Sequence, residues 1–83
     1  MYNLEIRKEV EKVLKKLSKK DKVSSIYISK KIKEIKENPY RFKPLQNFWR
    51  IHIGNYVLIY SINEKTKTVI IEKYKHHKEV YKI

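Results

Sequence analysis

Apolar residues in the first half of the chain recur at the spacing of two amphipathic helices. The first stripe, on a background of Lys and Glu, consists of Val10, Val13, Leu14 and Leu17. Its i, i+3, i+4, i+7 spacing predicts a helix of about three turns. The second stripe consists of Ile28, Ile32 and Ile35, with Ile26 and Tyr27 beside it. Together the two stripes predict a helical hairpin.

Polar residues and prolines mark the ends of these helices. Residues 18–22, SKKDK, are expected to separate the two helices, with Asp21 as the N-cap of the second. The second helix is expected to end at Asn38, because Pro39 disfavours helical geometry in the residue before it. Residues 39–47 contain both prolines and are expected to form a loop.

The remaining apolar residues alternate with polar ones, which is the pattern of β-strands. A short strand is predicted over residues 2–6, and three more over residues 48–53, 56–62 and 68–74. Gly54 and Asn55 fit a two-residue hairpin turn between the first two of these three. The predicted fold class is α+β, in the order β-α-α-β-β-β, with the helical hairpin packed on a small, mostly antiparallel sheet.

The two-residue turn also predicts the register of this hairpin. It pairs Ile53 with Tyr56, His52 with Val57, Ile51 with Leu58, and Arg50 with Ile59. The face expected to pack on the helices carries Trp49, Ile51, Ile53, Tyr56, Leu58 and Tyr60. The opposite face carries Arg50, His52, Val57, Ile59 and Ser61. We expect this second face to be available for binding, with something covering or bordering its two apolar residues.

Composition favours a single domain, residues 1–83, that attracts anionic partners. Lys and Arg number 21 against 9 Asp and Glu, a formal charge of +12, and such an excess attracts polyanions. Nucleic acid is the first candidate partner, an acidic protein the second and an anionic membrane surface the third. A Lys-rich proteome would raise the Lys content without any function behind it. The helical cations, interspersed with Glu, are expected to act as a general electrostatic collar.

Three classes of feature are missing from the sequence. There is no cysteine, which excludes disulfides and zinc–thiolate sites. No apolar run reaches the roughly 20 residues needed to span a bilayer, and the first residues, MYNLEIRKEV, lack the core of a signal peptide. We therefore expect a cytoplasmic protein that does not contact a membrane.

Side chains suited to phosphate chemistry are concentrated in the second half of the chain. The tail EKYKHHKEVYKI adds Lys73, Lys75, His76, His77, Lys78 and Tyr81. If the last strand lies beside the hairpin, this tail joins Arg50 and His52 in one patch. The patch would contain guanidinium, imidazole, ammonium and phenol groups, but no carboxylate.

This inventory suits metal-independent cleavage of RNA by the RNA's own 2′-hydroxyl. Imidazole titrates near neutrality and can act as base or acid. Arg and Lys can stabilise the negative charge that grows on the phosphoryl oxygens, and an aromatic ring can stack on an unpaired base. No cofactor is expected for such a reaction.

Simpler readings of the same residues remain open. The histidine pair can be a solvated strand end, Arg50 and His52 can be an ordinary polar sheet face, and Tyr81 can pack against the sheet. A metal site built from the three histidines has little support, because their spacing matches no metal-ligand motif. A phosphate-binding loop has none, because the chain has only one glycine.

The ordered motifs of the second half resemble the RelE/ParE toxin superfamily of toxin–antitoxin systems. In order they are Leu45 after a Pro-containing loop, a strand with Arg50 and His52, the strand GNYVLIY, and the ending KHHKEVY. The resemblance covers essentially the whole chain, including its length and element order. It implies the activity of the RelE branch, which cleaves messenger RNA on the ribosome.

The resemblance also implies roles for individual residues. By position, the catalytic residues would be Arg50, His52, Lys75, His77 and Tyr81. Further contacts to RNA would come from Arg41, Lys43, Lys73, His76 and Lys78. The RelE nucleases usually carry Arg where this chain has Val57. Either Arg41 or Lys43 would then supply the missing cation, or activity would be weak.

The partners implied by the resemblance are the ribosome with its mRNA and a cognate antitoxin. The antitoxin would be an acidic, amphipathic, RelB-like protein that forms a hetero-oligomer with the toxin. Two other functions remain open. One is a ParE-like inhibitor of DNA gyrase without nuclease activity, which Val57 favours, and the other is a non-catalytic ribosome- or RNA-binding module.

Overall fold

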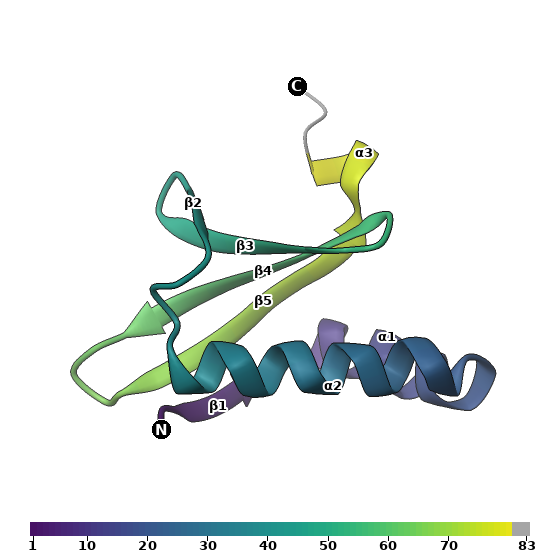
Figure 1. The fold of residues 1–83 in the computed structure, drawn as a ribbon, viewed down its shortest axis with the longest axis horizontal. Helices are drawn as coiled ribbons and strands as arrows, with labels where there is room; N and C mark the ends of the chain where they lie inside the picture. The colour runs from purple at the N-terminus through teal and green to yellow at the C-terminus, as the bar shows by residue number, and fades with distance from the viewer. Residues whose placement is uncertain (81–83) are drawn as a thin grey trace.

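The computed structural model describes residues 1–80, in which two long helices cover one face of a five-stranded sheet (Figure 1). The long helices are α1, Lys8–Lys20, and α2, Lys22–Glu37, and a short helix α3, His77–Val80, ends the described chain. The strands are β1, Asn3–Ile6; β2, Lys43–Leu45; β3, Phe48–Ile53; β4, Tyr56–Asn63; and β5, Thr68–His76. The predicted α+β class is confirmed.

Asp21 links the two long helices. Its amide donates to the carbonyl of Leu17 at 2.8 Å, and its carboxylate accepts hydrogen bonds from the amide and hydroxyl of Ser24 at 3.1 and 2.6 Å. The predicted cap is therefore confirmed, and these bonds hold the pKa of Asp21 below its ordinary value. The predicted separator over residues 18–22 is wrong, because α1 continues to Lys20. Lysine is a good helix former, and nothing before Asp21 breaks the helix.

The strands lie in the order β1-β5-β4-β3-β2. β1 runs parallel to β5, and every other neighbouring pair is antiparallel. The helices bury Val10, Ile28 and Ile35 against this sheet. The sheet contributes Ile51, Ile53, Leu58, Tyr60, Val69 and Ile71 to the same core. The contacts of α1 and α2 with the core therefore fall on one face, and the opposite face, called the outer face below, remains for other uses.

The predicted register of the β3–β4 hairpin is confirmed in all four pairs. Gly54 adopts a φ of +62° in the turn, a conformation that glycine accepts without strain. Tyr56 lies on the predicted helix-facing side, opposite Ile53, but it is 42% exposed and not buried in the core. Tyr56 lies at the end of the hairpin, where its ring stacks on Tyr74 with centroids 5.0 Å apart.

Two short elements depart from the prediction. Residues 39–47 are not wholly a loop, because β2 lies within them and pairs Lys43 with Arg50. Gln46 makes this pairing possible by turning the chain back with a φ of +55°. The tail beyond β5 forms α3, whose first turn is capped by the Nδ1 atom of His76 accepting the amide of Lys78 at 3.2 Å.

A β-bulge in β5 decides which side chains reach the outer face. Lys73 pairs with Ile59, and Ile71 pairs with Tyr60, so Glu72 is an extra residue between two paired ones. The extra residue shifts the alternation of side chains by one position. Val69 and Ile71 therefore face the core, whereas Lys73 and Lys75, at the same odd spacing, face outward.

The outer face has a buried apolar floor. Val57 is fully buried and Ile59 is 7% exposed. Helix α3 contacts β4 and lies on the side of the sheet away from α1 and α2 (Figure 1). The expectation that something borders these two residues is confirmed.

Candidate active site on the outer sheet face

Five cationic or titratable side chains form two cross-strand rows on the outer face. The first row runs Lys43, Arg50, Ile59, Lys73, and the second runs His52, Val57, Lys75. We call Lys43, Arg50, His52, Lys73 and Lys75 the cationic patch. The side chains of Val57 and Ile59 form the apolar floor between these charged groups.

The placement of Lys43 is unusual for a structural role. It lies directly opposite Arg50 across β2 and β3, and like charges directly opposite one another destabilise a sheet. The Nε atom of Arg50 is also buried, which keeps its guanidinium close to the sheet. A phosphate between such cations would relieve their repulsion, so this arrangement favours an anion-binding site.

The two neighbouring histidines have different environments. His77 sits against the hairpin turn, where the carbonyl oxygen of Asn55 accepts its backbone amide at 2.9 Å and lies 3.2 Å from its ring Nδ1. A carbonyl oxygen only accepts hydrogen bonds, so Nδ1 carries a hydrogen. In the neutral ring, Nε2 then holds the lone pair and is the nitrogen able to take a proton.

His76 points to the other side of the sheet. It pairs with Tyr56, on the helix-facing side, and its ring lies between Tyr56 and His77, with centroid distances of 5.4 and 4.8 Å. Its Nδ1 is used to cap α3. The structure thus gives His76 a role in anchoring α3 and does not place it among the cationic rows.

The other candidate residues lie in three different places. Arg41 forms an ion pair with Glu34 at 3.7 Å and covers the ring of Phe42, so it belongs to the end of α2 and not to the rows. Lys78 is exposed on α3. Tyr81 lies outside the described residues.

The sequence-based patch lacked carboxylates, and this expectation is wrong. Glu72 and Glu79 line a hollow on the outer face together with Lys73 and Lys75. Glu72 is extra in β5, and Glu79 belongs to a helix that was not predicted, so alternation along the strands could not place either one. Phe48 was also overlooked as a site residue, although it has the same parity along β3 as Arg50 and His52.

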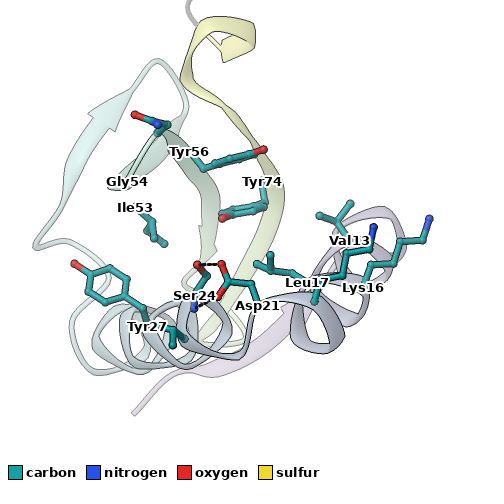
Figure 2. A pocket seen from close by; sticks show the side chains of 13 residues that line it. Val13, Lys16, Leu17, Asp21, Ser24, Tyr27, Ile53, Gly54, Tyr56 and Tyr74 are labelled. Atoms are coloured by element: carbon teal, nitrogen blue, oxygen red, sulfur yellow. Dashed lines mark hydrogen bonds between the residues drawn. The ribbon is translucent and has the colours of Figure 1, made fainter.

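A second hollow, of about 870 Å³, opens on the helix side of the sheet. Figure 2 shows it between the α1–α2 hairpin and the end of the β3–β4 hairpin. Its apolar walls include Val13, Leu17, Tyr27 and the stacked pair Tyr56 and Tyr74, and Lys16 lies at its rim (Figure 2). None of the cationic patch residues lines this hollow.

Residues 1–80 contain no group of three or more His, Asp or Glu side chains placed to hold a metal ion together. None of their helices is long and apolar enough to cross a membrane.

Comparison with known proteins identifies the family of this chain. A family model described as the ParE toxin of the type II toxin–antitoxin system parDE matches residues 4–81. A Methanocaldococcus jannaschii protein that carries the toxin name RelE4 is 42% identical over 87 residues, which span 99% of this chain and 93% of that protein. The chain belongs to the RelE/ParE toxin family. It is a toxin of the type II toxin–antitoxin class.

Several solved structures similar to this toxin are RelE proteins. Isolated Escherichia coli RelE superposes with a TM-score of 0.76 at 18% identity, covering 92% of this toxin and 84% of RelE. The RelE of the archaeal RelE–RelB complex from Pyrococcus horikoshii gives a TM-score of 0.73 at 25% identity, covering 90% and 93%. A Methanosarcina mazei relative is 41% identical over 86 residues, 98% of this toxin and 100% of the relative.

Proposed function

We propose that this toxin is an endoribonuclease that cleaves ribosome-bound mRNA in the cytoplasm, using the cationic patch. The observation that carries the proposal is the convergence of Lys43, Arg50, Lys73 and Lys75 from three strands onto one face, with His52 beside them. Neither helix packing nor solubility requires opposed cations in a sheet. A polyanion with a backbone phosphate explains them.

The reaction that suits these groups is an internal attack within the RNA. The 2′-oxygen forms a bond to phosphorus as its proton passes to a base, and the bond from phosphorus to the 5′-oxygen breaks as that oxygen receives a proton from an acid. The products are a 2′,3′-cyclic phosphate and a 5′-hydroxyl. His52 and His77 are the proposed proton carriers, with Nε2 as the reactive nitrogen of His77. Tyr81 stays a candidate for contact with the reacting phosphate.

The cations supply the electrostatic part of catalysis. As the 2′-oxygen attacks, negative charge grows on the phosphoryl oxygens, and preorganised cations stabilise it. This chain has Val57 where the RelE nucleases usually carry Arg, so the outer face lacks that cation. Lys43 and Lys75 are the cations that can replace it. Lys75 lies directly across from Val57, and Lys43 directly across from Arg50. Arg41 pairs with Glu34, so we assign the compensating role to Lys43 and Lys75.

Primer extension on mRNA from a translation extract tests the nuclease. The toxin is expected to produce cuts only when ribosomes are present. His77→Ala should slow cutting about 10²–10⁴-fold, the range for a lost general acid or base, and Lys43→Ala about 10²–10³-fold. Lys30→Ala, an exposed change on α2, is the control and should cut normally. Uncut mRNA, or equal cutting by all variants, would contradict the proposal.

A gyrase inhibitor is the second candidate, and Val57 is the observation that favours it. The same preparation should be added to DNA gyrase with supercoiled DNA. Gyrase-cleaved DNA accumulating while mRNA stays intact would establish this alternative. If neither target is affected but ribosomes bind the protein, it is a non-catalytic ribosome-binding module.

We also propose that a cognate acidic, amphipathic, RelB-like antitoxin occupies the helix-side hollow in a hetero-oligomer. Three of the similar solved structures are complexes of a RelE toxin with its antitoxin. In this toxin Val13 is 44%, Val23 80% and Tyr27 48% exposed, and all three line the hollow with Lys16 and Lys20. Apolar walls with a cationic rim complement an amphipathic segment that carries acidic residues.

Calorimetry with the purified cognate antitoxin tests this surface. Val23→Glu places a carboxylate on the apolar wall and is expected to weaken binding at least about tenfold, because it adds an unpaired charge to a desolvated contact. Val23 is exposed, so the folded toxin should tolerate the change. Lys30→Ala is again the control. Unchanged affinity of the Val23→Glu variant would place the antitoxin elsewhere.

A further inference from the structure

A hollow of about 290 Å³ lies on the outer face between α3 and the sheet. Its apolar walls include Phe48, Ile59 and Val80, and its charged residues include Lys73, Lys75 and Glu79. We propose that this hollow binds one unpaired nucleobase of the RNA, and that Glu79 selects bases with hydrogen-bond donors on their pairing edge. The proposal rests on the proposed nuclease function and assigns the base recognition that the cationic patch alone lacks.

The size of the hollow limits what it can accept. Small-molecule sites commonly measure roughly 300–1,000 Å³, so this hollow is at the lower limit and is too small for a helix or a folded partner. One flat ring system with its sugar is a suitable occupant. The hollow is about a third the size of the helix-side hollow, which measures about 870 Å³ against its 290 Å³.

The walls suit the faces of a nucleobase. Phe48 is 39% exposed on the outer face, at the start of β3 beside the turn from β2, two residues before Arg50 of the cationic patch. Exposed aromatic rings beside cations are the usual platforms on which unpaired bases stack. Ile59, 7% exposed, and Val80 from α3 provide apolar surface that needs no hydrogen bonds from the occupant.

The lysines connect the hollow to the proposed cleavage site. Lys73 and Lys75 line the hollow and also belong to the two cross-strand rows. A phosphate held by the rows carries a nucleotide whose base is only one ribose away. A backbone positioned for cleavage therefore delivers an adjacent base to this hollow without any further rearrangement.

The two carboxylates of the hollow differ in availability. Glu72 already accepts hydrogen bonds from Arg7 at 3.0 Å and from the Ser61 hydroxyl at 2.6 Å. Burial raises the pKa of Glu72, but the hydrogen bonds from Arg7 and Ser61 lower it by more, so the pKa lies below its ordinary value. Within residues 1–80, Glu79 has no such hydrogen bond or ion pair. Glu79 is therefore the carboxylate that is available to an occupant.

A carboxylate only accepts hydrogen bonds, and this decides which bases fit. Adenine and cytosine offer an amino group, and guanine offers an amino group next to a ring N–H. Uracil offers a single N–H between two carbonyl oxygens, which the carboxylate repels. Glu79 also repels phosphate, so a nucleotide enters with its base toward Glu79 and its phosphate toward Lys73 and Lys75.

Titration of the ¹⁵N-labelled toxin with nucleoside 5′-monophosphates, followed by NMR, tests the proposal. AMP, CMP and GMP are expected to shift the amide signals of Phe48, Lys73 and Glu79, and UMP to bind at least about fivefold more weakly. Phe48→Ala should weaken all four about tenfold or more. Glu79→Gln, whose amide both donates and accepts, should bind UMP nearly as well as AMP. Lys30→Ala, an exposed change on α2 that lines neither hollow, should match the unaltered toxin.

Several results would overturn the proposal. They are equal binding of UMP, shifts that map to the helix-side hollow, no shift with any of the four nucleotides at millimolar concentration, or unchanged selectivity in Glu79→Gln. The readout does not depend on cleavage. Selective binding by a protein that leaves mRNA intact would remove the nuclease and keep the base site. Cleavage without nucleotide selectivity would do the reverse.

Discussion

At the scale of single residues, Tyr60 shows how a buried polar atom positions the site. Its side chain is fully buried, and its hydroxyl donates to the carbonyl of Pro39 at 2.7 Å. Pro39 follows α2 and precedes β2, so this bond ties down the segment that brings Lys43 to Arg50. One phenol thus connects the core to the cationic patch.

Tyr60→Phe is expected to lower the free energy of unfolding by about 1–3 kcal/mol, because it leaves the buried Pro39 carbonyl without its donor. Urea denaturation at neutral pH measures this loss. Tyr27→Phe, which is 48% exposed, is the matched control and should change stability by less than about 0.5 kcal/mol. Equal stability of Tyr60→Phe and the unaltered toxin would show that the bond contributes nothing.

The same residue gives a pH dependence. Burial raises the pKa of Tyr60 above its ordinary value of 10.0, so the folded state holds the phenol proton more tightly than the unfolded state does. The resulting stability is fully present below pH 10 and is lost as pH rises beyond it. The stability of the unaltered toxin relative to Tyr60→Phe should therefore shrink in urea titrations above pH 10. A constant difference would contradict this assignment.

At the scale of elements, the turn between β3 and β4 does two things. Gly54 lets the hairpin close with a two-residue turn, and the Asn55 carbonyl then accepts both hydrogen bonds from His77. The turn therefore sets the hairpin register and also fixes the start of α3. Its geometry determines where the proposed catalytic imidazole sits.

Gly54→Ala is expected to lower the free energy of unfolding by about 1–2 kcal/mol, the penalty for a left-handed conformation with a Cβ atom. An added Cβ meets no atom within 4 Å, so the penalty comes from the backbone alone. Gly54→Asn should lose less, because Asn tolerates this conformation. Denaturation in guanidinium ranks the three proteins. An Asn variant less stable than the Ala variant would contradict the argument.

At the scale of the whole molecule, charge acts over different distances at different salt concentrations. The molecule measures 36 × 30 × 21 Å and carries +12. Electrostatic screening lengths are about 30 Å at 0.01 M salt and about 8 Å at 0.15 M. At low salt every Lys therefore attracts RNA, whereas at physiological salt only cations that touch phosphate contribute.

Fluorescence anisotropy with single-stranded RNA at several salt concentrations should separate these two groups. Lys73→Ala and Lys75→Ala are each expected to reduce the slope of log K against log salt by about 1, since each removes a phosphate contact. Lys30→Ala, with the same change in net charge, should leave the slope nearly unaltered. An equal loss of slope in all three would mean that the helices bind RNA as much as the sheet does.

The sequence by itself determined the parts of the fold that depend on local rules. The helical stripes, the Asp21 cap, the end of α2 before Pro39 and the hairpin register all follow from spacing or from a single residue's preferred conformation. These signals lie within a few positions of one another, so a pattern read along the chain captures them. Alternation along β3 likewise predicted that Arg50 and His52 face away from the helices.

Only the tertiary structure decided which other side chains meet them. The bulge at Glu72 turns Lys73 and Lys75 outward although Val69 and Ile71, in the same strand, point inward. The pairing of β2 brings Lys43 to Arg50, and α3 brings Glu79 over the sheet. Each depends on which strands become neighbours and where a ladder skips a residue. Those choices are settled by burial of the whole core and by backbone hydrogen bonds between distant segments, which no local pattern encodes.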